Sequence, residues 1–145
     1  MAKLDRKSFQ ELASVRLSDA RLLLAQGRFA AAFYLAGYVV ECSLKAGIAR
    51  GTEEFEFPDR KRVQESYSHD LEQLLGLMTQ IPRNEKRTPM EFDTYKALGS
   101  NWAFVCTKWS ASRRYEMATQ KEAEDLVAGI TDPDHGVLQW LQKYW

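Results

Sequence analysis

The chain has few of the residues from which nucleotide-binding loops and metal sites are built. Its eight glycines are scattered, and neither GxGxxG nor GxxxxGK[ST] occurs, so the sequence does not indicate dinucleotide-binding or P-loop chemistry. It has only two histidines, His69 and His135, and no HExxH motif. These histidines are too far apart in sequence to form a local zinc motif. The sequence therefore predicts neither a metal nor a cofactor.

Cysteine, net charge and long apolar runs are also scarce. Cys42 and Cys106 lie inside apolar helical patterns without a CxxC motif, which is typical of small buried side chains in a reducing compartment. Twenty basic and twenty acidic side chains give zero formal net charge, so no global field attracts nucleic acid or an anionic membrane. The first residues are too polar for a secretory signal, and the longest apolar run, 29–40, is shorter than the about 20 residues of a membrane span. We expect a cytoplasmic protein without membrane contact.

The most regular part of the chain predicts two long helices joined by a short turn. In the first, expected over 8–26, apolar residues recur at steps of three and four and so form one stripe on a helix. These residues are Phe9, Leu12, Ala13, Leu17, Ala20, Leu23 and Leu24. Gly27 interrupts the pattern. The second helix, expected over 29–51, is apolar almost without pause at its start, so we expect it to be central.

Capping residues mark the starts of further helices. The expected starts of the five helices that carry such a signal are Ser8, Ser68, Thr88, Thr119 and Asp132. A glutamate follows three residues after Ser8, Thr88 and Thr119, which is the capping-box spacing. The helix after Ser68 is expected over 69–78, and the one after Thr88 should be disturbed around Gly99. The charged stretch 52–67 is expected to be a loop with one short helical turn.

Short links between helices force neighbouring helices to run antiparallel. No segment alternates apolar and polar residues as a strand would. We therefore expect one all-α domain over 1–145, an antiparallel up-and-down four-helix bundle with one or two extra short helices. A chain of 145 residues is long enough to bury a core without disulfides or metal.

Three stretches, GRFAAAFYLAGYVVECSLKA, SHDLEQLL and WSASRRYE, follow one another in this order. Together they resemble the HEPN family, the nucleotide-binding helical domain found in higher eukaryotes and prokaryotes. The resemblance extends over about 12–140 and implies a helical bundle, commonly a homodimer, that binds nucleotides or RNA. Some relatives are metal-independent endoribonucleases of toxin–antitoxin or defence systems, often beside a small nucleotidyltransferase partner protein.

The resemblance also indicates a candidate catalytic pair. Arg62 and His69 are separated by six residues, which fits the arginine–histidine spacing of the ribonuclease relatives. A histidine can accept the proton of a ribose 2′-hydroxyl while an arginine stabilises charge on the phosphate. His69 also has a structural alternative, because beside Asp70 at a helix start it can cap or tether the loop. The sequence alone leaves open a serine or cysteine nucleophile with a histidine base.

Basic residues form three local clusters that can hold phosphate. They are Arg60, Lys61 and Arg62, then Arg83, Lys86 and Arg87, then Arg113 and Arg114. Tyr115 or Trp109 could stack on a base. The alternative is solvated loops, with Glu53, Glu54 and Glu56 partly neutralising the first cluster. Because the resemblance places RRYE on the helix that lines the family's binding face, Arg113, Arg114 and Tyr115 are the expected nucleotide- or RNA-binding residues.

Glu41 and Lys45 are charged residues in an otherwise apolar helix. Burying a charge is costly unless it is paired, and glutamate four residues before lysine is the favourable order on a helix. We expect a mutual ion pair, joined by an arginine such as Arg16 or Arg114. The alternatives are a catalytic carboxylate for Glu41 and a nucleotide or RNA contact for Lys45.

Three functions are consistent with this reading. The first is a HEPN-like domain that dimerises and binds nucleotide or RNA phosphate. The second is a metal-independent endoribonuclease, a toxin or defence effector that uses Arg62 and His69. The third is a non-enzymatic protein-interaction module in which the family's site has been lost.

Overall fold

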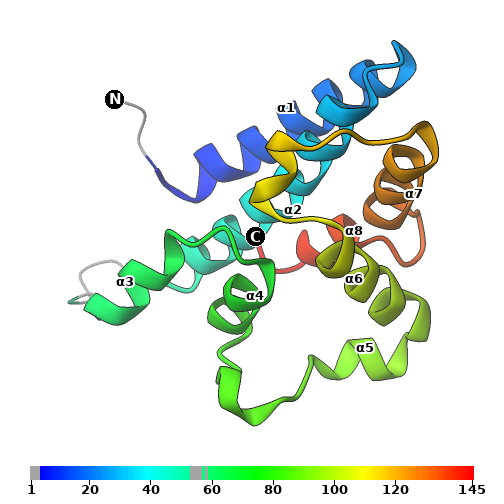
Figure 1. The fold of residues 1–145 in the computed structure, drawn as a ribbon. Coiled ribbons are helices and arrows are strands. Elements are labelled where there is room, and N and C mark those ends of the chain that lie inside the picture. Colours follow the sequence, from blue (N-terminus) through cyan, green and yellow to red (C-terminus); the bar gives the residue numbers. More distant parts are fainter. Residues whose placement is uncertain (1–3, 53–56, 58) are drawn as a thin grey trace.

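The computed structural model describes residues 4–52, 57 and 59–145, and this part of the chain folds into eight α-helices and two short 3-10 helices (Figure 1). No strand occurs among these residues. The expectation of an all-α fold is therefore confirmed. The 3-10 helices, η1 (Arg83–Glu85) and η2 (Ala111–Tyr115), lie in the links after α4 and α6.

The predicted helical hairpin consists of α1 (Arg6–Ala25) and α2 (Phe29–Arg50), which pack along each other (Figure 1). Gly27 makes the turn with a left-handed backbone, φ +74°, which glycine adopts without steric cost. The predicted cap of α1 is wrong. Asp5 caps the helix, and Ser8, the third helical residue, completes a capping box with both reciprocal hydrogen bonds at 2.9 Å.

α2 is the central helix, as its composition predicts. It packs against α1, α4 (Leu71–Thr79), α7 (Gln120–Thr131) and α8 (Val137–Leu141). By length and composition alone α2 is apolar enough to cross a membrane, but 61% of its most apolar window is buried inside the protein. Its apolar side chains therefore form the middle of the core.

The stretch 52–67 contains more helix than the sequence predicts. α3 (Arg60–Ser66) begins after Asp59, whose carboxylate accepts hydrogen bonds from the first backbone N–H groups of the helix. Asp70, rather than Ser68, caps α4 in the same way. Ser68 lies two residues before Asp70, and its hydroxyl accepts a hydrogen bond of 2.9 Å from the Asp70 backbone N–H.

The expected fourth helix is broken into α5 (Met90–Thr94) and α6 (Lys96–Lys108). The break is at Tyr95 and not at Gly99, where we expected it. Gly99 has another role, since a Cβ atom there would lie 2.8 Å from the backbone oxygen of Phe92. The glycine thus allows the first turn of α6 to approach α5 closely.

Of the three remaining helix starts, the one predicted for α7 is confirmed and those predicted for α5 and α8 are wrong. Thr119 and Glu122 form the predicted capping box at the start of α7. At α5 no side chain caps the helix, and Pro89 occupies the capping position instead of Thr88. Asp132 does not begin α8 but closes the turn before it. Its carboxylate accepts backbone hydrogen bonds from His135 and Asp134, which lower its pKa.

Trp109, at the end of α6, packs directly on the backbone of α2 at Gly37. A Cβ atom added to Gly37 would lie 2.0 Å from the indole ring. The indole Nε1 donates a hydrogen bond of 3.1 Å to the backbone oxygen of Tyr34. Glycine at this position therefore allows the segment after α6 to lie against the central helix.

The Gly37 contact generates a stability prediction with a matched control. Gly37→Ala should lower the free energy of unfolding by about 1–3 kcal/mol, because the new methyl group overpacks against Trp109. Gly129 lies inside α7 with its nearest neighbour at 3.6 Å, so Gly129→Ala should raise the free energy of unfolding by up to about 1 kcal/mol through helix propensity. Urea unfolding of both variants measures the two values. Equal effects at the two glycines would contradict the close packing of Trp109.

Candidate functional site

One face of α2 carries polar side chains in a helix that is otherwise mostly apolar. Residues separated by three or four positions lie on the same face of a helix. The four residues with this spacing are Tyr34, Tyr38, Glu41 and Lys45. We call them the α2 stripe. Glu41 is buried, whereas the other three are partly exposed.

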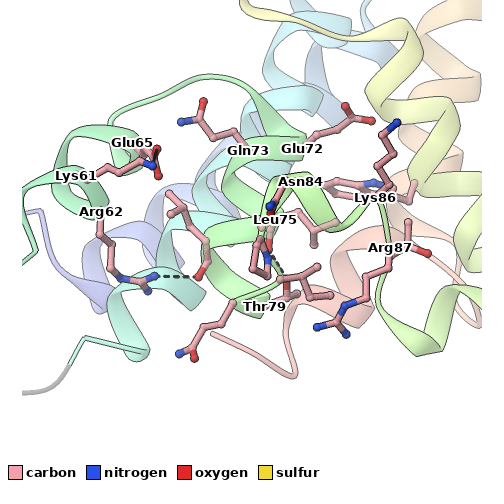
Figure 2. Close-up of a pocket in the computed structure, with 17 residues that line it drawn as sticks. Lys61, Arg62, Glu65, Glu72, Gln73, Leu75, Thr79, Asn84, Lys86 and Arg87 are labelled. Carbon is pink, nitrogen blue, oxygen red and sulfur yellow. Dashed lines mark hydrogen bonds and ion pairs between the residues drawn. The ribbon is translucent and has the colours of Figure 1, made fainter.

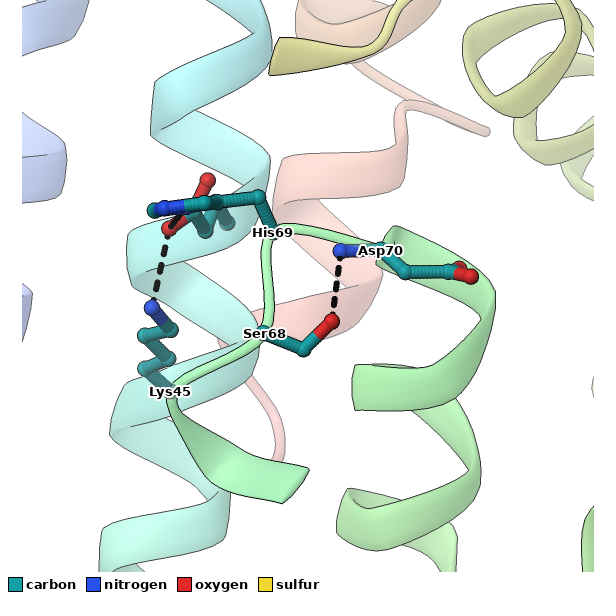
Figure 3. A network of polar contacts seen from close by, with 5 residues as sticks. Lys45, Ser68, His69 and Asp70 are labelled. Carbon is teal, nitrogen blue, oxygen red and sulfur yellow. Dashed lines mark hydrogen bonds and ion pairs between the residues drawn. The ribbon is translucent and has the colours of Figure 1, made fainter. Parts of the chain in front are cut away.

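The Glu41 carboxylate is the centre of the site. Its side chain is 3% exposed, and its Oε1 accepts hydrogen bonds from Lys45 Nζ at 2.9 Å and His69 Nδ1 at 2.8 Å (Figure 3). The predicted Glu41–Lys45 ion pair is confirmed. Its third member is His69 and not an arginine, since Arg16 pairs with Asp19. Within the described residues, Glu41 Oε2 is buried without a hydrogen-bond partner.

This arrangement fixes which nitrogen of His69 can act on a ligand. When the imidazole is neutral, Nδ1–H donates to the carboxylate, and Nε2 keeps its lone pair. The His69 side chain is half exposed, whereas its carboxylate partner is buried. A buried carboxylate that orients an imidazole is the arrangement found behind general bases. Nε2 is therefore the nitrogen available for proton transfer or for binding an anion.

A cavity of about 510 Å³ lies beside His69. Its polar or aromatic lining includes Glu72, Cys106, Trp109, Ser110 and Ser112. Burial raises the pKa of the Cys106 thiol, and it raises that of Cys42 to about 11. Both residues are free cysteines held in the thiol form, which makes them poor nucleophiles. The Ser110 hydroxyl bonds to Ser112 at 2.7 Å.

Aromatic rings connect the Glu41 centre to the other end of the α2 stripe. The Tyr38 ring centroid lies 6.3 Å from that of His69, 5.8 Å from Trp109 and 5.0 Å from Tyr34. A side-chain hydrogen bond with Tyr34, burial, and the nearby Glu41 carboxylate raise the pKa of Tyr38 well above its ordinary value. Tyr38 therefore stays a neutral phenol.

Arg114 lies at the Tyr34 end of the stripe. The neighbouring hydroxyl groups of Tyr115 and Tyr34 raise the pKa of its guanidinium. The guanidinium lies 4.9 Å from the centre of the Tyr115 ring. Tyr115 is 80% exposed, and Arg114 is exposed as well. Arg114 and Tyr115 are therefore accessible to a ligand beside the stripe.

Arg113 has a different environment from its neighbour. Its guanidinium lies 4.2 Å from the centre of the buried Phe33 ring, and Glu116 lies 3.2 Å from its Nε. Its side chain is only 17% exposed. Arg113 thus fastens η2 to the core. The RRYE segment itself is mostly a 3-10 turn and not the α-helix that the family resemblance implies.

Arg62 and His69 line different cavities. Arg62 lies on α3, where Nη1 donates a hydrogen bond of 3.1 Å to the backbone oxygen of Leu77 in the last turns of α4. Arg62 lines a separate cavity of about 890 Å³, whereas His69 lines the smaller one. Within one chain, the structure does not bring this candidate catalytic pair into one cavity. Glu72 lines both cavities.

Sequence reasoning missed Tyr34 and Tyr38, which it took as part of the apolar run of α2. The available signal was their spacing, because both fall on the helix face that carries Glu41 and Lys45. No group of three or more His, Cys, Asp or Glu residues that could hold a metal occurs in the described part of the chain. No protein-family model, curated protein or solved structure matches the chain.

The Glu41 centre generates a prediction about stability. Glu41→Ala should lower the free energy of unfolding by about 3 kcal/mol or more, because it leaves the mostly buried Lys45 ammonium without its anion. Glu41→Gln combined with Lys45→Met removes both charges and should cost distinctly less. Thermal and urea unfolding at neutral pH measure these differences.

The exposed Lys121–Asp125 pair of α7 is the matched control, since it has the same spacing on a helix. Lys121→Ala should change the free energy of unfolding by about 0.5 kcal/mol or less. A Glu41→Ala variant no less stable than Lys121→Ala would show that the buried carboxylate does not hold α2 and the His69 loop together.

Proposed function

We propose that this chain is a HEPN-type domain that binds a nucleotide or RNA phosphate at the α2 stripe. The observation that carries the proposal is the Glu41 centre, where a buried carboxylate orients a half-exposed His69 beside partly exposed aromatic rings. Arg114 supplies a permanent charge at the other end of the same face. A guanidinium and an imidazole on either side of aromatic rings suit a ligand that contains both phosphate and base.

Each side chain has a distinct role in this proposal. Arg114 binds a phosphate oxygen, and His69 Nε2 donates a second hydrogen bond when the imidazole is protonated. Tyr115 stacks on the base. Lys45 is held by Glu41 and contributes its charge at the edge of the site.

The proposed HEPN arrangement is an antiparallel up-and-down bundle of α1, α2, α6 and α7. Contacts between α1 and α2, between α2 and α7, and between α6 and α7 support it. The proposal includes a cytoplasmic homodimer. Large apolar side chains that are mostly exposed, such as Leu22 of α1 and Met117 after η2, are available for a dimer contact. A nucleotidyltransferase is the partner protein that the family resemblance suggests.

A metal-independent endoribonuclease is the second candidate function, and the orientation of His69 favours it. Nε2 would take the proton of a ribose 2′-hydroxyl, whose oxygen attacks the adjacent phosphorus as the bond to the 5′-oxygen breaks. The products are a cyclic phosphate and a 5′-hydroxyl, whose oxygen takes its proton from water as it leaves. Arg114 would stabilise the charge on the phosphate, whereas Arg62 would join His69 only across a dimer interface.

The binding proposal is tested by calorimetry with ATP, GTP and a short single-stranded RNA. Arg114→Ala should weaken binding of the responding ligand by about tenfold, because one charge-assisted hydrogen bond is lost. Lys121→Ala, on the exposed face of α7, is the control and should bind as the wild type does. If none of the three ligands gives heat or raises the melting temperature, the binding proposal fails.

The ribonuclease proposal is tested by RNA cleavage in the presence of a chelator. The wild type should cleave without added metal, and His69→Ala should lose that activity by roughly a hundredfold or more because the general base is missing. Circular dichroism checks that the variant is folded. Full activity in a folded His69→Ala variant would eliminate this mechanism and leave the non-enzymatic interaction module as the alternative to simple binding.

A further inference from the structure

The larger cavity brings together two basic clusters that are separated in the sequence. It is an open groove of about 890 Å³ between α3, α4 and the link 80–88. Four cationic side chains line it: Lys61, Arg62, Lys86 and Arg87. Figure 2 shows Lys61 and Arg62 on one side and Lys86 and Arg87 on the other. Two carboxylates, Glu65 and Glu72, also line this groove, so cations outnumber anions.

Of the four cations, the two lysines have the weakest ion pairs and hydrogen bonds within the protein. Lys61 lies 3.9 Å from Glu65, and its side chain is 83% exposed. Lys86 is exposed and has no ion-pair partner among the described residues. By contrast, Arg62 donates to the Leu77 backbone oxygen, and Arg87 pairs with Glu85. Both lysines can therefore bind an anion without losing a strong interaction within the protein.

The groove between the cations has a mixed chemistry. Ile81 gives it a partly exposed apolar side chain beside the mostly buried Leu75 and Trp102, and the side chains of Gln73 and Asn84 offer amide donors and acceptors. Inorganic polyphosphate has no apolar group to match this lining. A nucleotide chain has phosphates for the lysines, bases for the apolar part and hydroxyls for the amides.

The groove also adjoins the cavity beside His69. Glu72, in the first turn of α4, lines both of them. The two cavities therefore meet at the Glu72 carboxylate, which a strand that spans both of them would have to pass. The acidic residues Glu53, Glu54 and Glu56, which the sequence suggested as neutralising partners of the first basic cluster, lie outside the described residues.

We infer that single-stranded RNA is the ligand that fills the whole site: one phosphate of the strand lies at the α2 stripe and a second stretch of the same strand lies in the groove, whereas a mononucleotide fills only the stripe. This inference rests on the proposed function. Phosphates of the strand contact Lys61 and Lys86, and its bases cover the apolar part of the groove. The stripe and the groove together bind more phosphates than either could bind alone.

The test compares a short single-stranded RNA with ATP, using the double variant Lys61→Ala/Lys86→Ala. RNA binding should weaken roughly five- to tenfold, and the slope of log affinity against log salt should fall in magnitude by about 1.4, as expected for two lost contacts to a single strand. ATP binding should not change, because a mononucleotide reaches only the stripe. Fluorescence anisotropy measures the RNA affinities and calorimetry the ATP affinities.

Lys7→Ala/Lys96→Ala is the matched control. Lys7 lies 3.8 Å from Glu11 and is 84% exposed, and Lys96 is exposed to a similar degree, but neither lines the groove or the His69 cavity. This variant loses the same charge and should bind RNA with the wild-type salt slope. Melting temperatures of both double variants check that they are folded equally well.

The outcomes separate the two proposals. If the groove variant binds RNA like the control while Arg114→Ala weakens binding, the inference is overturned and the proposed function remains. If the groove variant weakens RNA binding while Arg114→Ala and His69→Ala have no effect, the site at the stripe is overturned, and the spanning strand with it. If polyglutamate of equal charge displaces the RNA as well as unlabelled RNA does, the assignment of the groove to nucleic acid is overturned.

Discussion

The burial of one carboxylate in the central helix determines how the rest of the site is built. A buried charge must be paired, and Glu41 takes one partner from its own helix and one from a distant loop. The contact with His69 connects α2 to the loop that leads into α4. Because Asp70 caps α4 immediately afterwards, the same loop sets where α4 begins. Both cavities border α4, so this loop lies beside each of them.

Local patterns were sufficient to predict the helices that depend on local interactions. The hairpin, the central place of α2 and the Thr119 capping box follow from periodicity and cap chemistry within a few residues. The errors occur where two candidate residues compete, as when Asp5 takes the cap position from Ser8. The break at Tyr95 was missed because it depends on how α5 packs against the start of α6, which sequence spacing does not encode.

The contacts of the candidate site were likewise predictable only where they are local in the sequence. The pairing of Glu41 with Lys45 follows from their spacing on one helix, but the approach of His69 is a contact across 28 positions that no local pattern reveals. The spacing of Arg62 and His69 suggested a pair, yet Arg62 lies in α3 and donates a hydrogen bond to a backbone oxygen of α4, whereas His69 lies in the link after α3 and bonds to Glu41. The basic groove was visible only as two unconnected clusters, because the fold of the intervening residues brings them together.

The contact between Gly37 and Trp109 has a consequence for how this sequence can change over time. The indole occupies the space that any side chain at position 37 would need, and it also bonds to the backbone of α2. A larger residue at position 37 is compatible with the fold only if the indole at 109 is replaced by something smaller. The residues at these two positions, 72 residues apart, therefore depend on each other. In an alignment of chains with this packing, they should covary.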